Sequence, residues 1–178
     1  MSKIFSITVI ILLLLLGCQN PKTVKLDTSK LEKLEEGSED QGIPISYKAP
    51  SLKDGLNALP FKMKLPKNLP FNAKPFQPPM IYDYSYNGKI VSAEFITNSK
   101  NNEDKILLKI SGFNHEFLEI SQEAEKINLI NEVTGYYYEK MLNFQSKGYS
   151  YTIVYVNDAI SEQQHKKEIV NMANQILE

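Results

Sequence analysis

The chain has 178 residues, of which 42% are hydrophobic, and a formal net charge of −1. A chain so close to neutral has no excess of basic residues for holding a phosphate backbone, so nucleic acid is not expected as a partner. Its 20 basic residues are all lysines. An anion would therefore be bound by lysine point charges or backbone amides and not by the planar fork of an arginine.

The first residues predict a secretory signal. Lys3 precedes an apolar run over residues 9–16 that is too short, and too unevenly flanked by charge, for an ordinary membrane-spanning helix. The run ends in Leu15-Leu16-Gly17-Cys18, which resembles the lipobox of bacterial lipoproteins. The resemblance implies that residues 1–17 are removed and that Cys18, the only cysteine, carries a diacylglyceryl group. Two acyl chains hold a protein stably, so we expect a cell-membrane anchor facing the extracytoplasmic side.

Two other interpretations of these residues stay open, namely an ordinary signal peptide with an incidental cysteine and an uncleaved amino-terminal anchor. Residues 18–50 are mostly polar and contain a charged block over residues 30–40. Such a composition cannot offset the entropy of ordering, so these residues are expected to form a flexible tether. A single globular domain is expected over residues 51–178.

Prolines gather between residues 44 and 79, which favours extended backbone around short strands such as residues 61–65. Because leucine, phenylalanine and methionine interleave with the prolines, we expect this lead-in to pack into the core. The alternative is a docking site for a partner that reads proline-rich segments. Ser51 is placed to begin a short helix that ends near Pro60.

From Met80 the hydrophobic pattern has a period of two residues. Residues 81–86 and 89–97 flank Asn87-Gly88, a typical two-residue hairpin turn. Further strands are expected over residues 105–111, 125–130, 136–139, 142–144 and 149–156. Ser161 and Gln164 match a capping box, and residues 169–177 repeat apolar positions at helical spacing. The expected fold is α+β, a twisted antiparallel sheet of about six or seven strands with a C-terminal amphipathic helix packed on one face.

Tyrosine clusters are the most unusual feature of the predicted strands. Tyrosines facing the same way on paired strands make flat rings with hydroxyl tips, which suit stacking on sugars or gripping a peptide. Tyrosine also has high strand propensity, so the same clusters are consistent with an ordinary sheet. The candidate binding residues are Tyr82, Tyr84, Tyr86, Tyr136, Tyr138, Tyr149 and Tyr151.

No catalytic or metal-binding residue is expected. His115 falls in a polar turn and His165 at an exposed position early in the predicted helix, and neither has a supporting motif. A nucleophile would need a base beside it, and lipidation would use the only thiol. We also find no glycine-rich phosphate loop, so no cofactor is expected.

Several motifs together carry a resemblance that covers residues 59–176. They are Leu59-Pro60-Phe61, Leu65-Pro66, Leu69-Pro70-Phe71, Gly135-Tyr136-Tyr137-Tyr138, residues 148–153 and the terminal helix. In these the chain resembles an uncharacterised extracellular domain family, of the domain-of-unknown-function type, found in Gram-positive lipoproteins and anti-sigma-like proteins. The resemblance implies a sensory or partner-binding module and assigns no catalytic residue.

The leading functional hypothesis is a non-enzymatic, lipid-anchored module that binds an envelope protein or a cell-wall component. One alternative is a carrier of lipid or another apolar ligand, with a dry pocket lined by Phe95, Ile96, Leu107, Leu108 and Ile153. The other alternative is an envelope hydrolase that uses carboxylates such as Asp83 and Glu94, which would need to lie close together in an open cleft.

Overall fold

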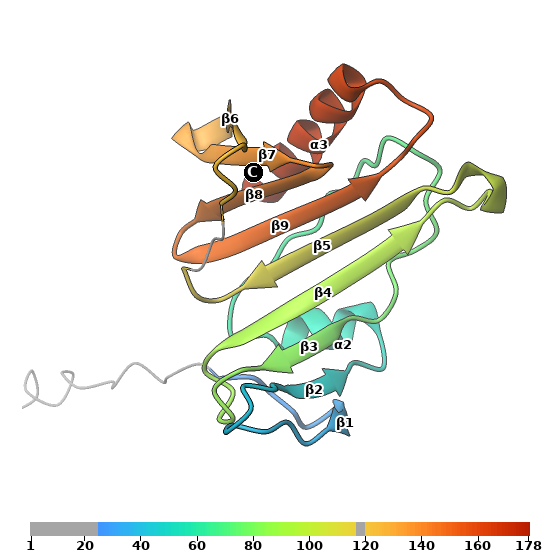
Figure 1. Cartoon of the computed structure of the whole chain (residues 1–178). Coiled ribbons are helices and arrows are strands. Elements are labelled where there is room, and N and C mark those ends of the chain that lie inside the picture. The colour runs from blue at the N-terminus through green and yellow to red at the C-terminus, as the bar shows by residue number, and fades with distance from the viewer. Residues whose placement is uncertain (1–24, 117–119) are drawn as a thin grey trace, which may run out of the picture.

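The computed structural model describes residues 25–116 and 120–178, so Cys18 and the predicted signal lie outside the described residues. The described part of the chain forms one antiparallel sheet of nine strands, in the order β1-β2-β3-β4-β5-β9-β8-β7-β6 (Figure 1). The strands are β1 (Glu32–Glu35), β2 (Ile45–Lys48), β3 (Met80–Asp83), β4 (Val91–Asn98), β5 (Leu107–Phe113), β6 (Glu125–Asn128), β7 (Thr134–Tyr138), β8 (Met141–Ser146) and β9 (Tyr149–Val156).

Two meanders make up this sheet. Strands β1 to β5 pair in chain order, and so do β6 to β9. The meanders are joined where β5 pairs with β9, from Leu107 opposite Val156 to Phe113 opposite Ser150. The α+β class and the antiparallel sheet are confirmed, whereas the expected six or seven strands are too few, because β1 and β2 were not foreseen.

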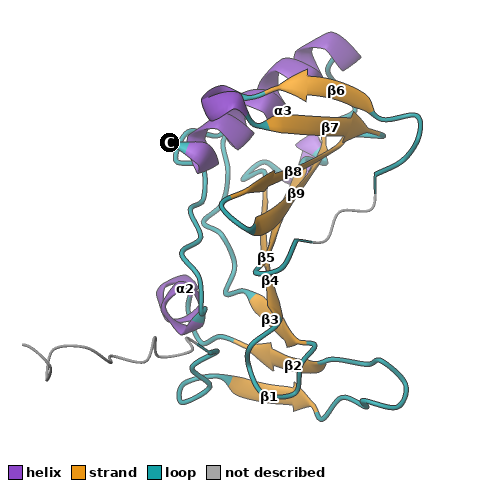
Figure 2. Cartoon of the chain, turned by 90° about the vertical axis from the view of Figure 1, so that its left-hand side faces the viewer, coloured by secondary structure: helices purple, strands orange, loops and turns teal. Residues whose placement is uncertain are grey.

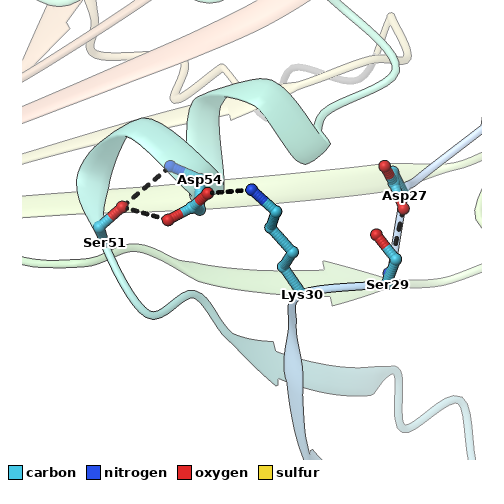
Figure 3. Close-up of polar contacts among 5 residues, drawn as sticks. All are labelled: Asp27, Ser29, Lys30, Ser51 and Asp54. Carbon is cyan, nitrogen blue, oxygen red and sulfur yellow. Dashed lines mark hydrogen bonds and ion pairs between the residues drawn. The ribbon is translucent and has the colours of Figure 1, made fainter.

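The two additional strands come from the segment that was expected to be a flexible tether. For residues 25–50 that expectation is wrong, because backbone pairing with β3 orders β2, and β2 in turn orders β1. Leu26 is buried, with 4% of its surface exposed, and joins the core. An ion pair of 3.0 Å between Lys30 Nζ and Asp54 Oδ1 also ties this segment to the helix α2 (Figure 3). Edge pairing of this kind needs no apolar pattern, so composition did not reveal it.

Helix α2 (Leu52–Ala58) begins at Ser51 as expected. The Ser51 hydroxyl oxygen accepts from the Asp54 amide at 3.1 Å and donates to the Asp54 carboxylate at 2.6 Å (Figure 3). The helix stops before Pro60, and residues 61–65 continue as extended chain. They pair with no strand in the described structure, although Phe61 and Met63 are buried. The lead-in therefore packs into the core, as its interleaved apolar residues predict.

The connection between β3 and β4 differs from the predicted Asn87-Gly88 turn. Asp83 pairs with Val91, so residues 84–90 form a longer loop. The buried Asp83 carboxylate holds this loop by accepting from the amides of Ser85 and Gly88, at 3.0 and 2.7 Å, and from the Ser85 hydroxyl at 2.8 Å. The carboxylate thus organises the loop together with one backbone hydrogen bond, from the Tyr84 amide to the Ile90 carbonyl at 2.9 Å. Two-residue turns occur instead at Glu139-Lys140 and Lys147-Gly148, whose φ values are positive.

Helix α3 (Glu162–Leu177) follows its predicted cap, with the Gln164 amide donating to the Ser161 hydroxyl oxygen at 3.3 Å. The Gln164 side chain does not reach back as a capping box requires, and binds Glu168 instead. The apolar stripe packs on β8 and β9, which confirms the helix on one face of the sheet. His165 is not exposed as expected, because it faces inward with 3% of its surface accessible.

Alternation along the strands gives the sheet two unlike faces. The core face carries buried apolar side chains such as Ile81, Phe95, Ile110 and Ile153, and α2, the lead-in and α3 pack against it (Figure 2). The opposite face, here called the open face, carries side chains at the alternate positions, and no helix of the described residues covers it (Figure 1). In the described structure, no helix has the length and hydrophobicity needed to span a bilayer.

Candidate binding surface on the open face

The strand register separates the candidate tyrosines into three groups. Tyr82, Tyr136 and Tyr138 belong to the open face, where they lie opposite Ser92, Asn143 and Met141. Tyr149 and Tyr151 have the parity of Ile153 and belong to the core side. Tyr84 and Tyr86 lie in the loop after β3; Tyr86 has a positive φ, and its hydroxyl donates to the Ile43 carbonyl at 2.5 Å.

Even on the open face the tyrosines do not form one continuous ribbon. Five strand spacings separate Tyr82 on β3 from Tyr136 on β7. At about 4.8 Å per spacing, these two rings stand roughly 24 Å apart. The sheet therefore splits the predicted tyrosine surface into two patches, one at each end of the open face.

The patch near β3 contains more aromatic rings than the tyrosines alone. The ring of Tyr84 lies 5.4 Å from that of Phe113, which lies 6.1 Å from the ring of His115. Tyr82 occupies the same cross-strand row as Phe113, with Ser92 between them. We name these four residues, Tyr82, Tyr84, Phe113 and His115, the aromatic strip. Tyr84 is 46% exposed and His115 is also exposed, so the strip is open to solvent.

Polar groups border the aromatic strip. The Ser92 hydroxyl lies 3.5 Å from the Tyr84 hydroxyl, and Glu94 and Lys109 form an ion pair of 3.2 Å on the neighbouring rows. Burial, followed by the nearby Glu94 charge, raises the pKa of the Tyr82 hydroxyl, which stays a neutral hydrogen-bonding group at physiological pH. The strip thus combines flat apolar rings with donors and acceptors at its margin.

Sequence reasoning missed Phe113 and His115 as members of this surface. Phe113 ends a strand and has the expected alternation, but its place beside Tyr84 depends on the register of β4 and β5. His115 follows two residues later on the same side of the chain. A pairing of β4 with β5 assumed from the hairpin order would have found Phe113, although not its register.

The other sequence-based sites are not assembled by the fold. Asp83 shares the core face with Val91, whereas Glu94 lies on the open face, so these two carboxylates point to opposite sides of the sheet. The residues proposed to line a carrier pocket are divided in the same way. Phe95, Leu108 and Ile153 are fully buried in the core, while Ile96 and Leu107 belong to the open face.

His165 has a structural environment that its sequence context did not reveal. Its Nε2 lies 2.6 Å from the carbonyl oxygen of Tyr155, and its Nδ1 lies 3.0 Å from the Tyr137 hydroxyl. A carbonyl only accepts, so Nε2 carries a proton and donates to Tyr155, while Nδ1 shares a hydrogen bond with the Tyr137 hydroxyl. Both nitrogens are thereby used in holding α3 to the sheet.

Histidine, cysteine, aspartate and glutamate form no cluster of three or more that could hold a metal ion within residues 25–116 and 120–178. No protein family, curated protein or solved structure matches the chain. The surface chemistry of the chain itself is therefore the basis for a functional proposal.

Proposed function

We propose that this protein is a non-catalytic binding module, anchored in the cell membrane through a lipid on Cys18, that contacts cell-wall glycan through the aromatic strip. The observation that carries the proposal is the row of solvent-accessible rings, Tyr84, Phe113 and His115, on the sheet face that is free of helices within residues 25–116 and 120–178. It favours the wall-component form of the binding hypothesis over a carrier, whose expected pocket residues lie on both faces of the sheet.

Glycan is the ligand that this chemistry fits. Pyranose rings have one face lined by C–H groups, which stacks on flat aromatic rings, and hydroxyls at the edge, which need polar partners. The strip offers both, since Ser92 and the Glu94–Lys109 pair border the rings. An aromatic contact contributes on the order of 1 kcal/mol, so a strip of this size supports weak binding that anchoring at the membrane would reinforce.

The position of the fold relative to the anchor supports a ligand close to the membrane. The chain between Cys18 and Lys25, where the described structure begins, spans at most about 25 Å when fully extended. Residues 25–50, which were expected to belong to a flexible tether, are part of the fold and add nothing to this span. A lipid on Cys18 would therefore keep the sheet beside the inner part of the wall.

Co-sedimentation with purified, insoluble peptidoglycan tests the proposal. The full-length protein is expected to sediment with it, and the double variant Tyr84→Ser, His115→Ser is expected to bind about thirtyfold more weakly, because two ring contacts of about 1 kcal/mol each are lost. Both side chains are exposed, so the fold should tolerate the change.

The matched control is Tyr136→Ser, Tyr138→Ser, which removes two aromatics of the open face outside the strip. This control should retain binding. The proposal is wrong if the native protein stays in the supernatant, or if both double variants bind as well as it does.

A further inference from the structure

Residues 61–65 are part of the proline-rich lead-in and are here named the lead-in segment. They have the side-chain pattern of a strand. Phe61 and Met63 are 5% and 9% exposed, while Lys62 and Lys64 point to solvent. The ring of Phe61 packs 5.3 Å from that of Tyr149. Met63 lies so close to β5 that a Cβ added at Gly112 would stand 2.6 Å from its sulfur. These contacts hold the segment against the core in an extended form.

The backbone of the lead-in segment has no strand beside it. Among residues 25–116 and 120–178, none donates a hydrogen bond to, or accepts one from, the main chain of residues 61–65. An extended segment with free amides and carbonyls has the same pairing capacity as the edge of a sheet. Peptides bind such edges by adding a strand, with main-chain hydrogen bonds supplying affinity and pockets supplying specificity.

A groove runs along the lead-in segment on the core side of the molecule. Its volume is about 930 Å³, and it is bounded by the lead-in, by the β8–β9 hairpin and by the end of α3. The apolar side chains that line it include Leu59, Phe61, Tyr149, Tyr151, Ile176 and Leu177. Two of the sequence-predicted tyrosines thus contribute to this groove, away from the aromatic strip.

The charged residues that line the groove are all basic. Lys62, Lys64 and Lys147 line it, and no aspartate or glutamate is among its lining residues. The closest acidic residue along the chain is Glu178, which follows the lining residue Leu177 and is exposed. The groove therefore combines an apolar floor, a lysine rim and a free backbone.

From these features we infer that the groove binds an extended acidic peptide that pairs with the lead-in segment as an added strand. In paired strands, opposite residues face the same side. Acidic residues of the ligand would lie opposite Lys62 and Lys64, and the residues between them would enter the apolar floor. The expected ligand alternates acidic and apolar residues. This site is separate from the aromatic strip and does not depend on glycan binding.

The test uses the full-length protein and a fluorescent peptide of alternating glutamate and valine, followed by fluorescence anisotropy. The peptide is expected to bind, and Lys62→Glu, Lys64→Glu is expected to weaken it at least tenfold. Lys89→Glu, Lys100→Glu makes the same change in net charge at two exposed lysines elsewhere and should bind the peptide like the native protein.

A second probe separates strand pairing from attraction between charges alone. The same peptide with alternate backbone nitrogens methylated keeps its charge but loses the amides needed for pairing, so its affinity should fall at least tenfold. Equal binding of the methylated peptide, or of a lysine–valine peptide, would overturn the inference. So would binding of dodecanoate with no binding of the peptide, because it would assign the groove to an acyl chain.

Discussion

At the scale of single residues, the most constrained group is a buried polar network beneath α3. The Tyr155 hydroxyl donates to the Glu168 carboxylate at 2.8 Å and accepts from the side-chain amide of Asn157 at 3.0 Å. His165 binds the Tyr155 carbonyl, so both the side chain and the backbone of Tyr155 form hydrogen bonds with α3. Burial is the main reason that the pKa of Tyr155 is raised, to about 12. The fold therefore depends on this phenol staying neutral.

This dependence gives a pH prediction. In the unfolded chain the Tyr155 phenol loses its proton near pH 10, but in the folded protein it does so only near pH 12. The unfolded state thus binds fewer protons in that interval, and stability falls as pH rises. The contribution lost is roughly 2 to 3 kcal/mol by the upper end of the range.

Urea unfolding at pH 9 and pH 11.5 measures this loss. The native protein should lose more stability between the two values than Tyr155→Phe, which has no phenol to ionise. Tyr84→Phe, which removes an exposed hydroxyl, should behave like the native protein. An equal loss in all three proteins would show that Tyr155 does not carry the effect.

The sequence predicted that tyrosine rings form the candidate surface, but it did not predict which residues belong to that surface. Tyr82 and Tyr84 were identified from alternation, and they do belong to the aromatic strip. Tyr149 and Tyr151 have equally good alternation but face the core side, since parity alone does not say which face is covered. Phe113 lies beside Tyr84 only because β4 pairs with β5 in this register. That pairing joins residues far apart in the sequence, so local patterns do not reveal it.

At the scale of elements, α2 approaches the sheet most closely at Gly55. A Cβ added at Gly55 would stand 2.2 Å from the Pro79 ring and 3.1 Å from the Ala49 side chain. The helix therefore reaches the sheet through a position without a side chain. Its first turn is fixed separately, by the Ser51 cap and the Lys30–Asp54 ion pair (Figure 3).

Replacing Gly55 with alanine should consequently destabilise the protein. In an exposed helix the change would stabilise by up to about 1 kcal/mol, but here overpacking against a rigid proline is expected to cost roughly 1 to 3 kcal/mol. Asn57→Ala, at an exposed position of the same helix, should be neutral or slightly stabilising. The comparison requires only the urea midpoints of the two variants. A Gly55→Ala protein as stable as the Asn57→Ala protein would disprove the contact.

Elements with a strong local pattern were predicted well from the sequence. Alternation located the strands from β3 to β9, and the Ser161 cap with its apolar stripe located α3. The missed elements are those held by backbone pairing or by a buried polar side chain and not by an apolar pattern of their own. Strand β1, Glu32–Glu35, is exposed and has three charged residues out of four, and only its pairing with β2 makes it a strand. The loop at Asp83 was mistaken for a tight turn because a buried carboxylate, and not Asn87-Gly88, organises it.

At the scale of the whole molecule, the proposed anchor determines where the surfaces can act. Cys18→Ser removes the atom that would carry the lipid, so the variant should leave the membrane fraction while the native protein remains there after a high-salt wash. Fractionation of cells followed by immunoblotting measures this. A Cys18→Ser protein that stays with washed membranes would contradict the lipid anchor. Lys22→Ser, four residues further on, serves as the control and should remain membrane-bound.

The pairing of β5 with β9, which joins the two meanders, has a consequence for folding during synthesis. The inner strand β5 has no partner on one side until β9 is synthesised, and β9 follows β6, β7 and β8 in the chain. A chain that ends early therefore leaves Leu107–Phe113 with a row of unpaired amides and carbonyls beside an uncovered core. Truncated products should be bound by chaperones, aggregate or be degraded, because β5 is then an unpaired edge strand of the first meander.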